Sequence, residues 1–214
     1  KGISIDDIRR GNTINPAIHK KLLELFKIYT LVGGMPEALN TWLETRSFPA
    51  VSKVQQNLLA SYRDDFAKYA PRFEPDILDE VMKKVPRMLG QQIKYSNING
   101  DVRSEIIKKA MNLLTTARIC HKIYAASADG IPLGATVNYR KFKTIFLDTG
   151  LASASLGLQM DVEMKNTDLI LVNKGAMAEQ VTGQLLRTAQ AAYREPALHY
   201  WARDKKGSEA EVDY

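Results

Sequence analysis

The sequence predicts a mainly α-helical protein with small β elements, an α+β fold. Apolar residues recur at helical spacing through the first 70 residues, where no alternating strand pattern appears. Residues 73–150 then run in the order helix, short helix, helix and two strands, and residues 151–214 contain a helix followed by two short strands. We therefore predict three consecutive segments at 1–72, 73–150 and 151–214.

The first segment is predicted to contain three helices. The first follows Asn15 as N-cap and Pro16 at its first position, where the missing proline N–H does no harm. Its apolar positions need a partner to pack against: Ile18, Leu22, Leu25, Phe26 and Tyr29. A second helix begins at Met35 to Glu37 after two glycines, and a third begins at Pro49.

The second segment has the outline of a winged helix. We expect a helix capped by Asp76, with Pro86 disturbing its end, a short polar stretch at 95–99 and a strongly periodic helix at 103–116. The last of these should turn four residues inward: Ile107, Ala110, Met111 and Leu114. Strands at 119–125 and 144–147, with a turn at Asp129-Gly130, complete the predicted two-stranded wing.

The third segment is predicted to begin an α/β domain that is truncated at the end of the chain. A helix from 174 to about 193 should turn Val181, Leu185, Leu186 and Ala189 inward. Strands at 199–202 and 209–214 follow, joined by a glycine-bearing turn. The final residues alternate like the middle of a strand, and the chain has no initiator methionine, so we expect a piece of a longer protein.

The composition indicates a folded, basic protein. Hydrophobic residues make up 45% of the 214 residues, and no apolar run approaches the ~20 needed to cross a bilayer. Cys120 is the single cysteine, which excludes an internal disulfide and favours a reducing cytoplasmic location. The net charge of +6 favours an anionic partner such as nucleic acid.

Four phrases resemble one protein family. They are YTLVGGMPEA at 29–38, SYRDDF at 61–66, KFKTIFLDTGL at 141–151 and EVDY at 211–214. In this order they resemble prokaryotic AAA+-type ATPases with a C-terminal domain of unknown function, family four-one-four-three. The resemblance implies an ATPase domain first, then a helical lid-like and connecting segment, a winged helix, and a domain similar to PD-(D/E)xK nucleases.

The resemblance places ATP and magnesium in an ATPase domain outside these residues. The chain contains no Gly-x-x-x-x-Gly-Lys-Ser/Thr sequence, so we expect no cofactor here and no ATP hydrolysis. The missing ATPase domain would itself be a partner, and we expect no membrane contact. For the full-length protein, the resemblance implies an ATPase.

The resemblance also implies an incomplete nuclease-like site. Glu179 matches the helix glutamate of that superfamily and Asp213 the strand aspartate, with Glu211 two residues before it on the same strand face. Glu179 and Asp213 would hold a divalent metal only if a Glu/Asp-x-Lys strand followed Tyr214. We expect the chain to be inactive as it stands. Alternatively, these carboxylates are ordinary solvated side chains.

Basic residues surround the predicted recognition helix and wing. The predicted DNA contacts are Arg103, Lys108, Lys109, Arg118, Lys122, Lys141 and Lys143, with Lys94, His121 and Arg140 nearby. They could equally form a solvated face, because Glu105 and Lys109 are spaced to pair. Tyr200 and Trp201 could stack on bases or pack in a core.

Three functions therefore stay open at this point. The first is a DNA-associated accessory region of an ATPase. The second is a protein-interaction or oligomerisation module of that ATPase, and the third is a metal-dependent nuclease when full length.

Overall fold

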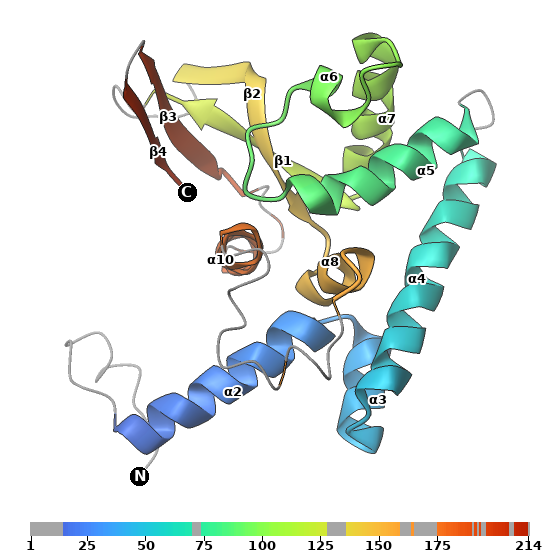
Figure 1. Cartoon of the computed structure of the whole chain (residues 1–214), viewed down its shortest axis with the longest axis vertical. Coiled ribbons are helices and arrows are strands. Elements are labelled where there is room, and N and C mark those ends of the chain that lie inside the picture. Colours follow the sequence, from blue (N-terminus) through green and yellow to red (C-terminus); the bar gives the residue numbers. More distant parts are fainter. Residues whose placement is uncertain are drawn as a thin grey trace.

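The protein is mainly helical with a small sheet, which confirms the predicted α+β class (Figure 1). The computed structural model describes residues 15–69, 74–127, 136–158, 164, 175–189, 191, 193, 196–205 and 208–213. In Figure 1 the first described helix crosses the bottom of the molecule, the long helix that ends at Tyr69 runs up its right side, and the sheet lies at the upper left.

The first three described helices are α2 (Pro16–Val32), α3 (Pro36–Thr45) and α4 (Phe48–Tyr69). The predicted cap of α2 is confirmed, because the Asn15 side chain accepts a hydrogen bond from the Ala17 N–H at 2.9 Å. The last turn of α2 is buried, whereas its earlier apolar face stays exposed. Leu22, Leu25 and Phe26 are 42%, 50% and 48% exposed, so the expected packing of this face is not found among the described residues.

The next helices are α5 (Pro75–Lys84), the 3-10 turn η1 (Val85–Met88), α6 (Tyr95–Ile98) and α7 (Ser104–Thr116). The predicted cap at Asp76 is wrong, because Pro75 occupies the first position of α5 and Glu74 precedes it as N-cap. The predicted disturbance at Pro86 is confirmed, since the helix tightens into η1 where the proline N–H is missing. The four residues predicted to turn inward from α7 are all buried: Ile107, Ala110, Met111 and Leu114.

The sheet consists of β1 (Cys120–Ala126), β2 (Val137–Phe146), β3 (His199–Lys205) and β4 (Ser208–Val212), in the order β2-β1-β3-β4. The predicted pair β1–β2 is antiparallel, but β3 joins the open edge of β1 in parallel and β4 pairs antiparallel with β3. An open edge presents unpaired N–H and C=O groups, which explains why β3 adds there. The predicted turn at Asp129-Gly130 lies outside the described residues.

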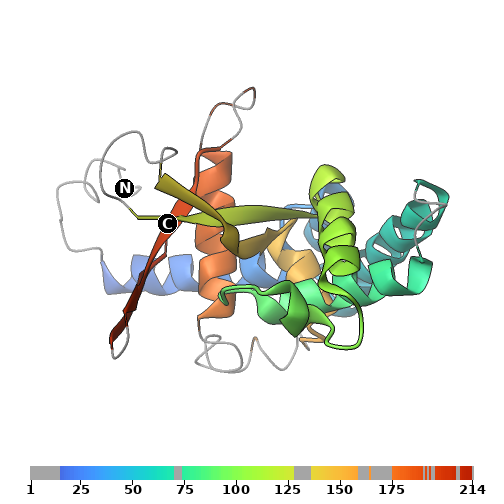
Figure 2. The same ribbon diagram turned by 90° about the horizontal axis from the view of Figure 1, so that it is seen from above.

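Two further helices are α8 (Thr149–Ser155) and α10 (Ala176–Thr188), which lies next to the sheet (Figure 2). Val181 is buried as predicted, but Leu185 and Leu186 are 48% and 40% exposed, so the predicted inward face of α10 is wrong there. The buried Gln180 side chain explains the difference. It accepts a hydrogen bond from the Phe146 N–H at 2.7 Å and donates one to the Phe146 carbonyl at 2.9 Å.

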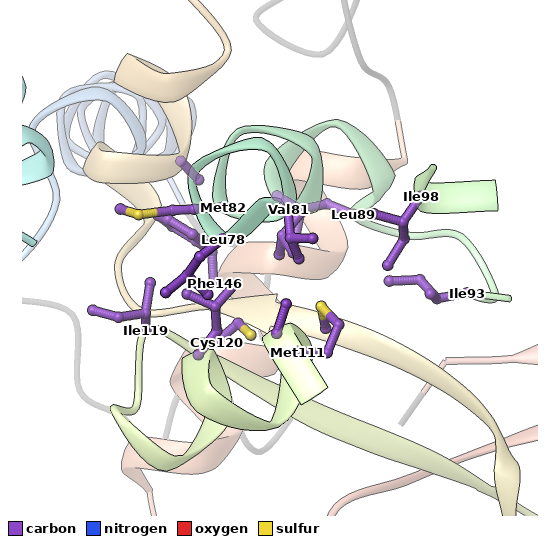
Figure 3. Close-up of a cluster of buried hydrophobic side chains, with 14 of the residues drawn as sticks. Leu78, Val81, Met82, Leu89, Ile93, Ile98, Met111, Ile119, Cys120 and Phe146 are labelled. Atoms are coloured by element: carbon purple, nitrogen blue, oxygen red, sulfur yellow. The ribbon is translucent and has the colours of Figure 1, made fainter. Parts of the chain in front are cut away.

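The largest buried cluster joins α5, α7, β1 and β2 (Figure 3). Leu59 of α4 and Leu151 and Ala152 of α8 belong to the same cluster. Side chains from all three predicted segments therefore pack together. The division at 72 and 150 stays a prediction about sequence organisation.

Candidate functional site

A buried lysine brings two of the predicted site carboxylates together. Lys143 on β2 is 1% exposed, and its Nζ lies 2.9 Å from Glu179 Oε2 and 2.6 Å from Asp213 Oδ1. Glu179 lies in the first turn of α10, and Asp213 comes directly after β4. Three separate elements thus meet at one ammonium group, and the expected proximity of Glu179 and Asp213 is found.

The lysine is buried because both faces of β2 are covered near its end. Phe142 and Phe146 pack into the large core, while Ile145 packs on the other face with Tyr200 of β3. The Lys143 Nζ lies 5.5 Å from the centre of the Tyr200 ring, a favourable cation–π distance. Tyr200 is 1% exposed, so core packing is confirmed for this ring.

The position of Glu179 depends on a close approach between α10 and the loop after η1. Gly90 has φ +75, and a Cβ atom there would lie 3.0 Å from Glu179 Oε1 and 3.2 Å from the Ala176 Cα. Only glycine adopts this backbone conformation without strain and leaves space for both groups. Glu179 also benefits from the partial positive charge at the N-terminus of α10.

Lys143, Glu179 and Asp213 form what we call the Lys143 cluster, and its two carboxylates already bind a cation, the Lys143 ammonium group. A divalent metal held by Glu179 and Asp213 would have to displace the Lys143 ammonium or share its space. Within the described part of the chain, no group of three or more His, Cys, Asp or Glu side chains could hold a metal. The Glu211 side chain lies outside the described residues.

The burial of Lys143 corrects its predicted role as a DNA contact. A side chain that is 1% exposed and bonded to two carboxylates cannot reach a phosphate in this conformation. One signal in the sequence could have indicated this position. Lys143 stands within the apolar end of a strand, between Phe142 and Ile145, where a charge requires a partner.

Most of the other predicted DNA contacts lie at the surface. Five basic residues around α7 and β2 are exposed: Arg103, Lys108, Lys109, Arg118 and Arg140. Lys94 before α6 is also exposed, while Lys141 and His121 are half-buried. The structure thus leaves a set of cations at the surface on and beside α7.

Lys122 on β1 differs from these surface cations, because it is half-buried beside α7. Its Nζ donates a hydrogen bond to Asn112 Oδ1 at 2.6 Å and lies 3.5 Å from the Tyr95 hydroxyl. It also lies 5.7 Å and 5.2 Å from the ring centres of Tyr95 and Phe142. Burial lowers the pKa of Lys122, and the nearby charge of Lys108 adds to this.

A second polar cluster joins two of the phrases on which the resemblance depends. Asp148 is 3% exposed, and its carboxylate accepts hydrogen bonds from the Gly34 N–H at 2.7 Å and the Leu151 N–H at 3.0 Å. The first bond joins α8 to the turn between α2 and α3, and the second caps α8. The Thr30 carbonyl at the end of α2 accepts a further bond from Ser153 of α8 at 2.9 Å.

The negative charge of Asp148 affects the pKa values of two tyrosines. Burial raises the pKa of Tyr29 and of Tyr62, and the negative charge of Asp148 raises both further. In the sequence, the segments at 29–38 and 141–151 drew attention only because they resemble the same protein family. Nothing in the spacing of Gly34 and Asp148, which are 114 positions apart, predicted that they touch.

No helix in the described ranges combines the length and the hydropathy needed to cross a membrane.

Comparison with known families gives one match. A family model described as "Domain of unknown function (DUF8612)" matches residues 23–162, from the middle of α2 to beyond α8. Neither a curated protein nor a solved structure matches the chain. The matched region covers more than half of the sequence and includes α7, β1, β2 and Asp148, and the chain therefore belongs to the family of this domain of unknown function, DUF8612.

Proposed function

We propose that this chain is a DNA-associated accessory region of a AAA+-type ATPase and that it contacts duplex DNA through α7 and the β1–β2 hairpin. The order of elements supports a winged helix as the contacting module. Between α5 and α6 the chain makes an isolated bridge to β2, where the Ile93 N–H donates to the Phe142 carbonyl at 2.8 Å. Helix, bridge, short helix, helix and hairpin then follow each other as in helix-turn-helix proteins with a wing.

The main support for DNA contact is the set of basic residues at the surface of α7. Four of its apolar residues are buried, which leaves Lys108 and Lys109 exposed on the opposite face. Arg103 directly precedes the helix and Arg118 closely follows it, both exposed. Lysine and arginine side chains in such an arrangement neutralise phosphates on either side of the groove that a recognition helix enters.

The test is a salt titration of duplex binding. Anisotropy of a labelled random-sequence duplex is measured for the chain and for a variant in which Lys108, Lys109 and Arg118 are all changed to Ala. Each lost phosphate contact lowers the slope of log affinity against log salt by about 1, so the variant should lose about 3. Binding that is unchanged in the variant would contradict the assignment.

A matched control removes the same charge elsewhere. Lys20 and Lys21 of α2 and Lys53 of α4 are exposed, and their change to Ala lowers the net charge equally. This control should retain most of the affinity. Equal losses in both variants would mean that only overall charge matters. Absence of binding at low salt would favour a protein-interaction or oligomerisation module.

A protein-interaction or oligomerisation module is the second candidate function. The exposed apolar face of α2 favours it, because Leu22, Leu25 and Phe26 form a helical stripe of the kind that partners cover. Sedimentation of the chain over a range of concentrations tests self-association. A shift to dimer that is lost on changing Leu22 and Phe26 to Ser would support this function.

A metal-dependent nuclease is the third candidate, and the convergence of Glu179 and Asp213 favours it. Because Lys143 stands between these carboxylates, we expect this chain to leave plasmid DNA intact with magnesium or manganese. Cleavage that is lost on changing Glu179 to Gln would instead establish a nuclease.

A further inference from the structure

The exposed face of α7 carries one amide whose orientation is determined by a neighbour. Asn112 is exposed and lies one turn after Lys108. Its Oδ1 accepts a hydrogen bond from Lys122 Nζ at 2.6 Å, which is shorter than the 3.5 Å from Lys122 Nζ to the Tyr95 hydroxyl. An ammonium group has three donors and no acceptor, so the amide atom that faces Lys122 must be the oxygen. The amide NH₂ group of Asn112 therefore faces away from Lys122.

Lys122 is itself held in place, which makes this orientation persistent. Its ammonium lies over the rings of Tyr95 and Phe142 and near the Tyr95 hydroxyl. Phe142 is fully buried, and Tyr95 packs against the same core. A cation that contacts two ring faces and two oxygen atoms loses several favourable contacts if it moves. The Asn112 oxygen is consequently directed toward the protein, and the amide hydrogens toward the surface.

This orientation changes which base an asparagine can recognise. A free asparagine pairs with adenine through two bonds, in which its oxygen accepts from N6 and its NH₂ group donates to N7. With the oxygen bonded to Lys122 and turned toward the protein, the NH₂ donors are the part of the amide that faces the groove. Guanine presents two neighbouring acceptors, O6 and N7, and no donor at that position, so it matches a donor-only group best.

We propose that Asn112 is a specificity-determining residue of the DNA-contacting surface, and that Lys122 sets its preference for guanine over adenine by holding the amide oxygen. This inference rests on the proposed DNA-binding function and deepens it. Lys122, which the sequence suggested as a phosphate contact, thereby acts as a positioning residue for Asn112. The exposed cations beside it supply affinity that is independent of sequence.

The test is selection from a randomised duplex library, followed by affinity measurements on the selected site and its single-base variants. The unmodified chain should prefer guanine over adenine by about tenfold at one position, the effect of one good base contact. Asn112→Ala should lose this preference while overall affinity falls little. Lys122→Met keeps an apolar side chain between the rings but frees the amide oxygen, so adenine should then bind at least as well as guanine at that position.

Asn40→Ala is the matched control, because Asn40 is an exposed asparagine on α3, far from α7 (Figure 1). It should leave the base preference unchanged. Asn112 is exposed, so its variant tests the proposal even if Lys122→Met unfolds. Retention of the guanine preference by Asn112→Ala, or by a folded Lys122→Met, overturns the role of Asn112 while DNA binding stands. Absence of duplex binding by every form at low salt overturns the proposed function as well.

Discussion

Removal of the Lys143 charge tests how much the ion pairs of Lys143 with Glu179 and Asp213 contribute to the stability of the fold. Lys143→Met keeps most of the aliphatic stem but removes the ammonium that Glu179 and Asp213 share. Both carboxylates then lose the ammonium group that each contacts in the folded chain. We expect a large loss of stability near neutral pH, because this contact stabilises the folded chain and not the unfolded one.

The structure determines the size of this loss. Breaking a buried ion pair by removing one partner costs about 3–5 kcal/mol, since the remaining charge is left uncompensated. Glu179 is 16% exposed and retains most of this penalty, whereas Asp213 is 44% exposed and water can partly replace the lysine. The lower end applies, so we expect a loss of about 3 kcal/mol in the free energy of unfolding.

Urea unfolding followed by circular dichroism measures this change. Lys53→Met is the matched control, because Lys53 is exposed on α4, and it should shift stability by no more than about 0.5 kcal/mol. The triple variant Lys143→Met, Glu179→Gln, Asp213→Asn removes all three charges. It should recover at least about 1 kcal/mol, because the two carboxylate charges are removed together with the ammonium that they contact.

Two outcomes would refute this reasoning. A Lys143→Met protein within about 1 kcal/mol of the unmodified chain would mean that the lysine does not bridge the carboxylates in solution. A triple variant that is less stable than Lys143→Met alone would mean that the carboxylates contribute through contacts other than this charge cluster.

Two further predictions concern the Asp148 cluster. Gly33→Ala combines a strained φ of +76 with a Cβ 2.1 Å from Asp148 Oδ1, whereas Gly157→Ala has φ +71 and nothing within 4 Å of its Cβ. In thermal melts Gly157→Ala should cost about 1–2 kcal/mol and Gly33→Ala clearly more, and equal costs would contradict the close approach of Asp148. The raised pKa values of Tyr29 and Tyr62 mean that the folded protein holds the two phenol protons more tightly than the unfolded chain does. The protonated tyrosines therefore contribute fully to stability below the ordinary pKa of 10.0, and this contribution is lost as the pH rises above it. Asp148→Asn should lower both pKa values in a phenolate absorbance titration, and an unchanged titration would show that the carboxylate is not near the rings.

Local patterns were sufficient to predict most helices. The Asn15 cap, the proline at the start of α3 and the four inward positions of α7 follow from chemistry within a few residues of each other. The same reasoning predicted that α7 would present Lys108 and Lys109 outward. The expected proximity of Glu179 and Asp213 came from the resemblance and not from local patterns.

The face of α10 could not be predicted in this way. Its apolar pattern favoured Leu185 and Leu186 as buried, but the two hydrogen bonds between Gln180 and the backbone of Phe146 orient the helix differently. Gln180 and Phe146 are 34 positions apart. Periodicity describes one helix at a time and contains no information about which polar side chain will meet the open edge of a strand such as β2.

The class of fold and the positions of most elements could be predicted because they depend on interactions between residues close along the chain. Which lysines stay at the surface depends on contacts between distant residues, and these became visible only in the folded chain. The apolar neighbours of Lys143 in the sequence indicate that it needs a partner, but not that its partners are carboxylates 36 and 70 positions away. Lys122 is likewise held against Asn112 and two rings. The physical reason is that a buried charge must find a partner wherever the fold provides one, and that partner can come from any part of the chain.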